Sequence, residues 1–186
     1  GVNLSALQPQ GDTVLQVSDV EAAGQNNLLR GVRRAMAKNM ADAHRRVARS
    51  TVTGECDISA WPEPKRPLLR LIRAIGRACQ SVPELNARFD DDLGVLSANA
   101  TVDLGIAMET ADGLFTPHIT DVCSKTDRAL AEAVLTLRQA VGERKITMPQ
   151  LTGQTIALSN FGAYGGKFAD MIVVPPQVAI VGSGAI

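Results

Sequence analysis

Aromatic residues are scarce in this chain, which has four phenylalanines, one tyrosine and one tryptophan among 186 residues. Proteins that bind single-stranded nucleic acids stack the bases on aromatic side chains, so this scarcity argues against such a binding surface. Net charge is lacking as well, because 19 basic and 19 acidic residues cancel. A nucleic-acid or anionic membrane surface as the main partner would require an excess of positive charge. We therefore expect neither.

Long apolar runs and paired cysteines are also missing. The longest apolar stretch, at residues 171–181, is interrupted by two adjacent prolines, so we expect no membrane span. Cys56, Cys79 and Cys123 are odd in number and have no metal-ligand spacing, so neither a disulfide framework nor a metal site is expected. No signal peptide is recognisable at the start. These absences predict a soluble protein with reduced thiols inside the cell.

The composition that remains is typical of a globular protein. Apolar residues make up 45% of the chain, which is enough for a core, and 186 residues fit one domain of ordinary size. Residues 1–24 have too few large apolar side chains for a core of their own, and residues 25–27 resemble a linker. We predict a main domain at residues 25–186 that follows a tail at residues 1–24.

Three segments have apolar residues at helical spacing, which predicts three helices that each bury one face. The first helix spans residues 31–48, and its apolar face comprises Val32, Met36, Met40, Ala43 and Val47. The second begins at Pro67, and its apolar face comprises Leu68, Leu71, Ile72, Ile75 and Cys79. The third follows a predicted cap of Ser124 with Asp127, and its apolar face comprises Leu130, Val134, Leu137 and Val141.

Other segments have the alternation or the short apolar runs that are typical of strands. These segments are residues 50–58, 93–96, 100–108, 114–119, 156–158 and 177–182. The pair Asp112-Gly113 predicts a turn before the fourth of them. Strands interspersed with helices in this order predict an α+β fold, an α/β sandwich with its helices on one face.

Ser159 is the first candidate for a catalytic group. It follows the apolar run of residues 156–158 and precedes a turn rich in glycine. A hydroxyl at that position is suited to face a cleft and to donate a hydrogen bond to an oxyanion formed during acyl transfer. The alternative is a strand end at which the polar side chains bond only to the local backbone. This window alone leaves both interpretations open.

The two histidines are weaker candidates. His44 lies among the basic residues of the first predicted helix, where a solvated surface is the simpler interpretation. His118 falls in a predicted strand, where a structural histidine is more common than a general base. The sequence around them gives neither a catalytic role.

Several phrases together resemble one family. They are GVRRAMAKNM at residues 31–40, VPELNARF at 82–89, ADGLFTPHI at 111–119, LSNFG at 158–162 and VPPQVAIVG at 174–182. Their order is similar to that in the catalytic domain of dihydrolipoamide acyltransferases, the core components of 2-oxo acid dehydrogenase complexes. The resemblance covers residues 28–186. Residues 1–24 look like the tail of the peripheral subunit-binding domain that precedes this domain in the family.

The resemblance implies a fold like that of chloramphenicol acetyltransferase, with a mixed sheet and helices on one face. It implies trimers that build a cubic or dodecahedral core, with the active site in a channel between two subunits. An acyl group would pass between dihydrolipoamide and coenzyme A, the lipoyl group being carried on another domain and no metal being needed. Implied partners are the dehydrogenase and dihydrolipoamide dehydrogenase components, bound through the upstream domain. The implied location is the cytoplasm, or the mitochondrial matrix in a eukaryote.

Family roles transfer to only a few residues. Ser159 matches the oxyanion donor by its place in LSNFG, and Asn160 and Gly162 are expected to shape the adjoining channel. Arg33 matches a basic position of the first helix and is expected to be structural, near the site. The family's base lies in a His-x-x-x-Asp-Gly motif that neither His44 nor His118 matches. We therefore expect that the base lies past residue 186, that the chain is truncated, and that it is inactive alone.

Two further functions fit the same sequence. One is a non-catalytic core subunit of such a complex, which keeps the fold but lacks the base. The other is a chloramphenicol-type O-acetyltransferase, against which the N-terminal stretch argues. The connection at residues 61–67 is shorter than in the family, which changes one channel wall or subunit contact. Acetyl, branched-chain acyl and succinyl groups would be distinguished by a pocket whose walls the sequence does not identify.

Overall fold

The computed structural model describes residues 29–62, 66–110 and 113–185. The tail predicted at residues 1–24 lies outside these residues, so the domain boundary stays a prediction. In the described ranges, no helix is long and apolar enough to cross a lipid bilayer.

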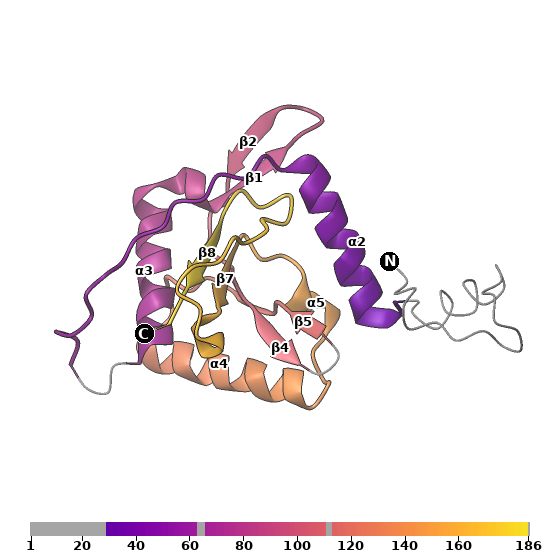
Figure 1. Cartoon of the computed structure of the whole chain (residues 1–186). Helices are drawn as coiled ribbons and strands as arrows, with labels where there is room; N and C mark the ends of the chain where they lie inside the picture. The colour runs from indigo at the N-terminus through magenta and orange to yellow at the C-terminus, as the bar shows by residue number, and fades with distance from the viewer. Residues whose placement is uncertain (1–28, 63–65, 111–112, 186) are drawn as a thin grey trace, which may run out of the picture.

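A four-stranded sheet forms the centre of the molecule (Figure 1). Its strands, in spatial order, are β6 (His118–Ile119), β3 (Leu104–Ile106), β7 (Ile156–Asn160) and β8 (Ile180–Ser183). The strands β3, β7 and β8 are parallel, and β6 runs antiparallel to β3, so the sheet is mixed as expected. The carboxyl ends of the three parallel strands therefore lie at one edge of the sheet.

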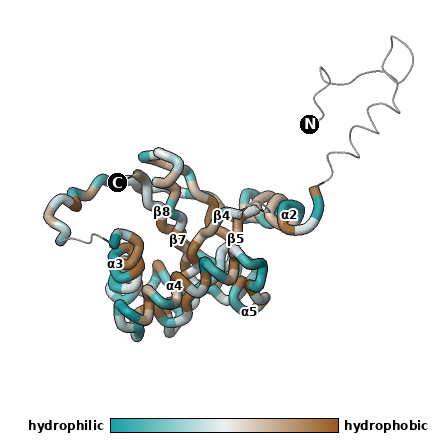
Figure 2. The backbone as a smooth tube through the Cα atoms, turned by 90° about the horizontal axis from the view of Figure 1, so that it is seen from below, coloured by the Kyte–Doolittle hydropathy of each residue, from teal (hydrophilic) through white to brown (hydrophobic). Residues whose placement is uncertain are grey.

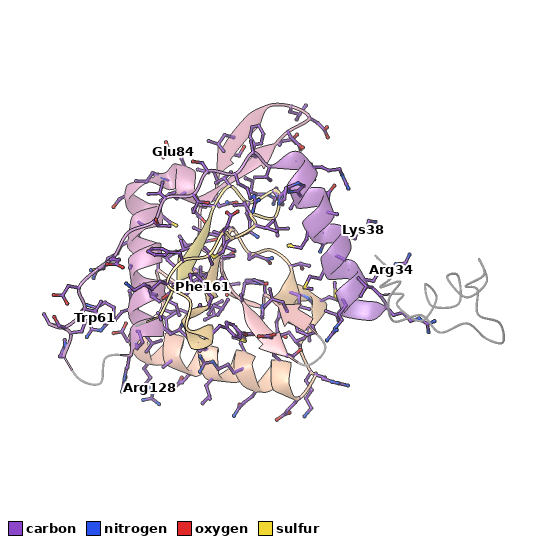
Figure 3. All side chains as sticks on the ribbon, in the orientation of Figure 1. Arg34, Lys38, Trp61, Glu84, Arg128 and Phe161 are labelled. Carbon is purple, nitrogen blue, oxygen red and sulfur yellow. The ribbon has the colours of Figure 1, made fainter. Side chains whose placement is uncertain are left out.

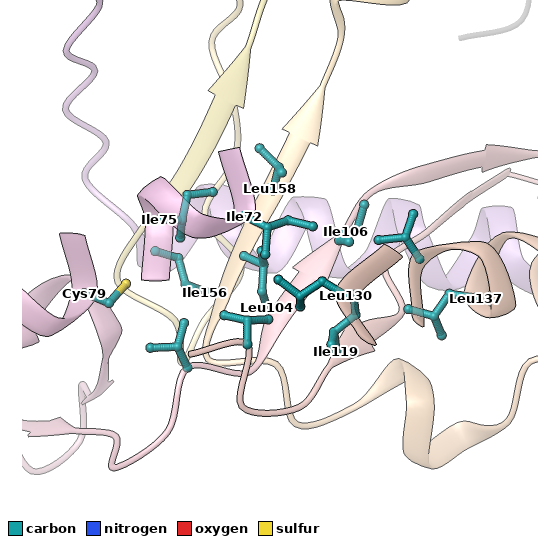
Figure 4. Close-up of a cluster of buried hydrophobic side chains, with 13 residues drawn as sticks. Ile72, Ile75, Cys79, Leu104, Ile106, Ile119, Leu130, Leu137, Ile156 and Leu158 are labelled. Atoms are coloured by element: carbon teal, nitrogen blue, oxygen red, sulfur yellow. The ribbon is translucent and has the colours of Figure 1, made fainter. Parts of the chain in front are cut away.

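Helices α3 (Pro67–Ser81) and α4 (Asp127–Gly142) cover one face of this sheet. Their apolar faces meet the sheet in one core, which Figure 4 shows around Ile72, Leu104, Leu130 and Leu158. The apolar faces predicted for both helices are confirmed, because each was read from the helical period that burial imposes. Burial of such side chains, at about 1.5–3 kcal/mol each, is the main term that holds the two layers together.

Two small antiparallel pairs flank the central sheet. Strands β1 (Ala87–Asp90) and β2 (Val95–Ala98) form one pair, and β4 (Met108–Thr110) and β5 (Gly113–Phe115) form the other. The strand predicted at residues 100–108 is thus divided between β3 and β4. The turn predicted at Asp112-Gly113 falls partly on residues 111–112, outside the described ranges, and the strands on its two sides, β4 and β5, pair antiparallel.

Helix α2 (Gly31–Arg46) lies to one side of the sandwich and contacts β5 (Figures 1 and 2). The most buried residue of its predicted apolar face is Ala43, which has no exposed surface. Three short helices complete the described fold: η2 (Pro83–Asn86), α5 (Met148–Leu151) and η3 (Gly162–Tyr164).

The strand predicted at residues 50–58 is wrong. These residues alternate in polarity, but no described strand pairs with them, and Val52 is 94% exposed. The segment is attached by polar side chains instead: the Thr51 hydroxyl donates to the Asp170 carboxylate at 3.1 Å, and Glu55 forms an ion pair with Lys167 at 2.9 Å. Alternation alone does not make a strand, because a strand also needs a neighbour for its backbone hydrogen bonds.

The cap predicted for the third helix is also wrong. Thr126, and not Ser124, precedes α4, and its hydroxyl accepts a hydrogen bond from the Ala129 backbone N–H at 3.2 Å. The Ser124 hydroxyl instead donates to the Asp121 carbonyl at 3.1 Å. Both residues suit a cap by type, and the chain begins its helical turn two residues later than we expected.

Candidate active site

Ser159 lies near the carboxyl end of β7, on the face of the sheet that turns away from α3 and α4. Ile156 and Leu158 point into the core beneath the helices. Because side chains alternate along a strand, Ala157 and Ser159 point to the opposite face. Ala157 is buried, whereas Ser159 is partly exposed. The strand therefore holds one hydroxyl rigidly at the border between the packed sheet and solvent.

The Ser159 hydroxyl makes no hydrogen bond to any residue that the structure describes. Among the described residues, Oε1 of Gln154 is the only side-chain oxygen or nitrogen atom that is both fully buried and without a hydrogen-bond partner. Since the Ser159 oxygen has no partner either, it must be accessible to solvent. The interpretation as a strand end with local backbone bonding thus does not hold for Ser159. Its donor is available to a bound molecule.

Small residues flank Ser159 on both neighbouring strands. Gly182 of β8 pairs with it directly. On the other side Ala107 follows β3, and its backbone N–H donates to the Leu158 carbonyl at 2.9 Å. A side chain at position 182 would meet Met171, since an added Cβ would lie 2.7 Å from the Met171 sulfur. The space over Gly182, beside Ser159, is therefore filled by the Met171 side chain and bordered by the Phe161 ring.

The turn after Ser159 is held by its own backbone and by one side chain. Oδ1 of Asn160 accepts a hydrogen bond from the Gly162 backbone N–H at 3.2 Å. The Phe161 N–H donates to the Ser183 carbonyl at 3.0 Å, which ties the turn to the end of β8. Gly162 packs against the backbone of Gly184, where no side chain would fit. Asn160 and Gly162 therefore fix the chain direction immediately after the serine.

A hollow of about 360 Å³ lies at the carboxyl ends of β3 and β7. Asn160 and Ala163 line it after the end of β7, and Met108 lines it from β4. Leu68 of α3 and Val141 of α4 line it as well, so it lies on the helix-covered face of the sheet, opposite the Ser159 side chain. Its charged lining residues are Glu109 and Arg138. Ligands of sheets with parallel strands commonly bind at this edge. Of the two residues expected in the channel, Asn160 lines this hollow and Gly162 supports the turn behind it; their role in binding stays a prediction.

Arg33 lies on α2 beside the β4–β5 hairpin. A Cβ added to Gly113 of β5 would lie 3.9 Å from the Arg33 Cγ atom. Arg33 is exposed and has at least one polar interaction partner. These contacts indicate that Arg33 helps to join α2 to the β4–β5 hairpin. No described contact connects Arg33 to Ser159.

Neither histidine has a described contact with Ser159. His118 pairs with Gly105, which pairs with Ala157, so its Cα atom is about 12 Å from that of Ser159 by strand spacing and rise. Its Nδ1 atom lies 3.1 Å from the Gln150 carbonyl oxygen. His44 is exposed in the last turn of α2. No group of three His, Cys, Asp or Glu side chains in the described ranges could hold a metal ion.

Our sequence analysis missed several residues around Ser159. Ala107 and Gly182 become its neighbours only through parallel pairing, which a single sequence does not reveal. Arg138, which lines the hollow on the helix-covered face of the sheet, was missed as well; it lies beside the apolar face of α4, four residues after Val134 and three before Val141. This spacing was visible, but nothing in the sequence indicated a cavity at that edge of the helix.

Residues 21–186 match the model of the 2-oxoacid dehydrogenases acyltransferase family, catalytic domain. The chain belongs to this family. It is 31% identical over 166 residues to the lipoamide acyltransferase component of the branched-chain alpha-keto acid dehydrogenase complex of Pseudomonas putida. That match covers 82% of this chain and 39% of the Pseudomonas protein, so the chain spans about two fifths of this relative. Our identification from five sequence phrases is confirmed.

Solved structures of the family share the fold. A truncated catalytic core of the 2-oxoacid dehydrogenase complex from Thermoplasma acidophilum aligns with a TM-score of 0.77 and 25% identity, over 85% of this chain and 78% of that one. The dihydrolipoamide acetyltransferase of Azotobacter vinelandii aligns with a TM-score of 0.75 and 23% identity, over 86% and 74%. The fold expected from chloramphenicol acetyltransferase, a mixed sheet with helices on one face, is confirmed.

Proposed function

We propose that this chain supplies the oxyanion-stabilising part of an acyltransferase that moves an acyl group between dihydrolipoamide and coenzyme A. Membership of the family supports this reaction. The single structural observation that supports it best is the Ser159 hydroxyl, which is held at a strand end, reaches solvent and has no described partner. The relatives act in branched-chain and pyruvate-type complexes, and either acyl class fits this chain.

The chemistry explains why a free hydroxyl is needed. A thiolate that attacks a thioester forms a tetrahedral intermediate with negative charge on the former carbonyl oxygen. The Ser159 O–H donates a hydrogen bond to that oxygen, and β7 keeps the donor in place without reorganisation. Binding energy is thus concentrated on the charge that exists only in the transition state.

The attacking thiol also needs a base, because a free thiol is mostly protonated near neutral pH. Neither His44 nor His118 matches the family's motif for that base, so the proposal gives the role to neither. The proposal takes the base from the family's His-x-x-x-Asp-Gly motif, outside residues 1–186. The Azotobacter acetyltransferase, whose catalytic mechanism has been investigated through a serine, a histidine and an asparagine, has the same fold.

The remaining parts of the proposal concern assembly. Coenzyme A and the lipoyl group are the expected substrates. Trimers of this domain would form the building block of a larger core, to which the dehydrogenase components bind through an upstream domain. The expected location is the cytoplasm, or the mitochondrial matrix in a eukaryote.

The test compares two serine variants in the longest form of the protein that its gene encodes. Ser159→Ala should lower the rate of acyl transfer from acyl-dihydrolipoamide to coenzyme A by about a hundredfold or more. Ser183→Ala is the matched control, because Ser183 ends the neighbouring strand but pairs with Asn160, on the other face. Equal rates in both variants would show that Ser159 is not the donor. If the wild-type protein transferred none of the acetyl, isobutyryl and succinyl groups, the result would instead favour the hypothesis of a non-catalytic core subunit.

A further inference from the structure

Helix α3 carries four arginines on the side opposite its apolar face. Arg66 precedes the helix, and Arg70, Arg73 and Arg77 follow at spacings of four, three and four. Residues at these spacings share one side of a helix. The apolar face of the same helix contains Ile72, Ile75 and Cys79. The four arginines, named here the arginine row, therefore lie on the outer side of α3.

The arginine row borders a concave surface. A hollow of about 360 Å³ is lined by all four arginines, by Leu69 and Ala74 of α3, and by Asp127 at the start of α4. Its size is that of a small-molecule site. Figure 3 shows the neighbouring landmarks, with Trp61 beside α3 and Arg128 near the corner where α3 and α4 meet. A row of cations in a hollow differs from a row on a convex surface, because several cations can contact one ligand.

Two of the arginines are held by the protein itself. Nε of Arg73 bonds to the Asp127 carboxylate at 2.8 Å, and its Nη1 donates to the Val122 carbonyl at 3.1 Å. The Arg70 guanidinium stacks on the Trp61 ring, 4.9 Å from the ring centre. These contacts order two positive charges in advance, so little conformational entropy is lost when a ligand binds.

The other two arginines are exposed, with no partner among the described residues. Arg66 and Arg77 take part in no described hydrogen bond or ion pair. Their donors are therefore available to an anion. Among the described residues that line the hollow, Asp127 is the only carboxylate, and its Oδ1 is bonded to Arg73. Among these described lining residues, positive charge therefore exceeds negative charge.

We propose that this hollow is a binding site for the phosphate groups of a small molecule that carries several of them. Planar guanidinium groups bind phosphate oxygens in pairs of parallel hydrogen bonds. From Arg66 to Arg77 the row extends about 16 Å at the rise of a helix, which gives room for two or three linked phosphates. A linear polyphosphate or a nucleoside triphosphate has this length and charge.

The site is separate from Ser159. The core lies between them, because Ile72 and Ile75 pack on the sheet face that carries Ile156 and Leu158, and Ser159 points away from that face. A ligand in the hollow cannot extend to Ser159 without passing through packed side chains. The proposal therefore does not depend on the acyltransferase proposal.

Trp61 provides the measurement. It is the only tryptophan in the chain, and it touches Arg70, so its fluorescence reports any change in the arginine row. The 186-residue chain is titrated with tripolyphosphate at low ionic strength. We expect a saturable change that the double variant Arg66→Gln/Arg77→Gln weakens at least tenfold. Both substitutions spare the Arg70 and Arg73 contacts, and circular dichroism verifies that the helices remain.

The matched control is Arg34→Gln/Lys38→Gln, which removes the same charge from the exposed side of α2. This control should keep wild-type affinity to within a factor of two, as should Ser159→Ala. A parallel titration with ATP tests whether the natural ligand is a bare phosphate chain or a nucleotide. Tighter binding of ATP than of tripolyphosphate would indicate a nucleotide. The proposal would be overturned if neither tripolyphosphate nor ATP bound saturably, or if both double variants lost the same affinity. It would also be overturned if a pentaglutamate peptide bound and the two phosphate compounds did not.

Discussion

The Thr155 hydroxyl donates a hydrogen bond of 2.5 Å to Oδ1 of Asn86, and both residues are buried. The bond joins the start of β7 to the short helix η2, 69 residues earlier in the chain. The Thr155 oxygen also accepts from the Asp103 N–H at 3.0 Å, and the Asn86 amide donates to the Thr101 carbonyl at 2.8 Å. This network positions the strand that carries Ser159 at its other end.

Thr155→Val should destabilise the fold by about 1–3 kcal/mol, because it leaves the buried Asn86 oxygen and the Asp103 N–H without their partner. The shape of the side chain is kept, so packing changes little. Urea unfolding measures the free energy. Thr120→Val makes the same change at an exposed position and should have almost no effect. Equal stability in the two variants would show that the network contributes nothing.

Gly162→Ala should distort the turn behind Ser159. An added Cβ would lie 2.7 Å from the Gly184 carbonyl carbon and 3.0 Å from the Ala185 Cα atom, so the backbone must move. We expect a loss of about 1–3 kcal/mol in unfolding free energy, which is typical of overpacking. Gly142→Ala is the control, since a Cβ there meets nothing within 4 Å. A turn that accepts alanine at position 162 without loss would refute the close approach.

Stability should fall as the pH rises above about 9, through two thiols. Burial raises the pKa of the Cys79 thiol above its ordinary value, and burial with the nearby Asp121 carboxylate raises the pKa of Cys123. Over this pH range the folded state therefore keeps thiol protons that the unfolded state loses. The stability that the protonated thiols contribute is complete below the thiol pKa of the unfolded state and is lost as the pH rises through the thiol pKa of the folded state.

The measurement for these thiols is the unfolding free energy from pH 8 to 10. The variant Cys79→Ala/Cys123→Ala should have a shallower decline than the wild type. Cys56→Ala, which removes an exposed thiol, should keep the wild-type slope. Parallel slopes in all three proteins would exclude the buried thiols as the cause.

The sequence predicted best where burial imposes a period. The apolar faces of α3 and α4 were correct in every residue, since a helix against a sheet needs that repeat. The position of Ser159 at a strand end also followed from the sequence, because an apolar run met a polar pair and a glycine-rich turn. Burial and chain breaks are local signals, and a single sequence contains them.

Pairing between distant segments was not predictable in the same way. Residues 50–58 have strand-like alternation, but whether a neighbour exists is decided by the rest of the fold. Ala107 and Gly182 flank Ser159 only because three strands run parallel. The spacing of the four arginines can be read from the sequence. The hollow beside them cannot, because the start of α4, with Asp127, forms part of its wall.

The most direct test of the account is the steady-state kinetics of Ser159→Ala, with Ser159→Thr as the conservative partner, in the longest encoded protein. A donor that acts only on the oxyanion predicts a kcat about a hundredfold or more below wild type in Ser159→Ala, with the KM for coenzyme A within a factor of a few. Ser159→Thr, which keeps a hydroxyl, should recover much of that loss. A kcat that is unchanged in Ser159→Ala, or a loss that appears only in KM, would contradict the account.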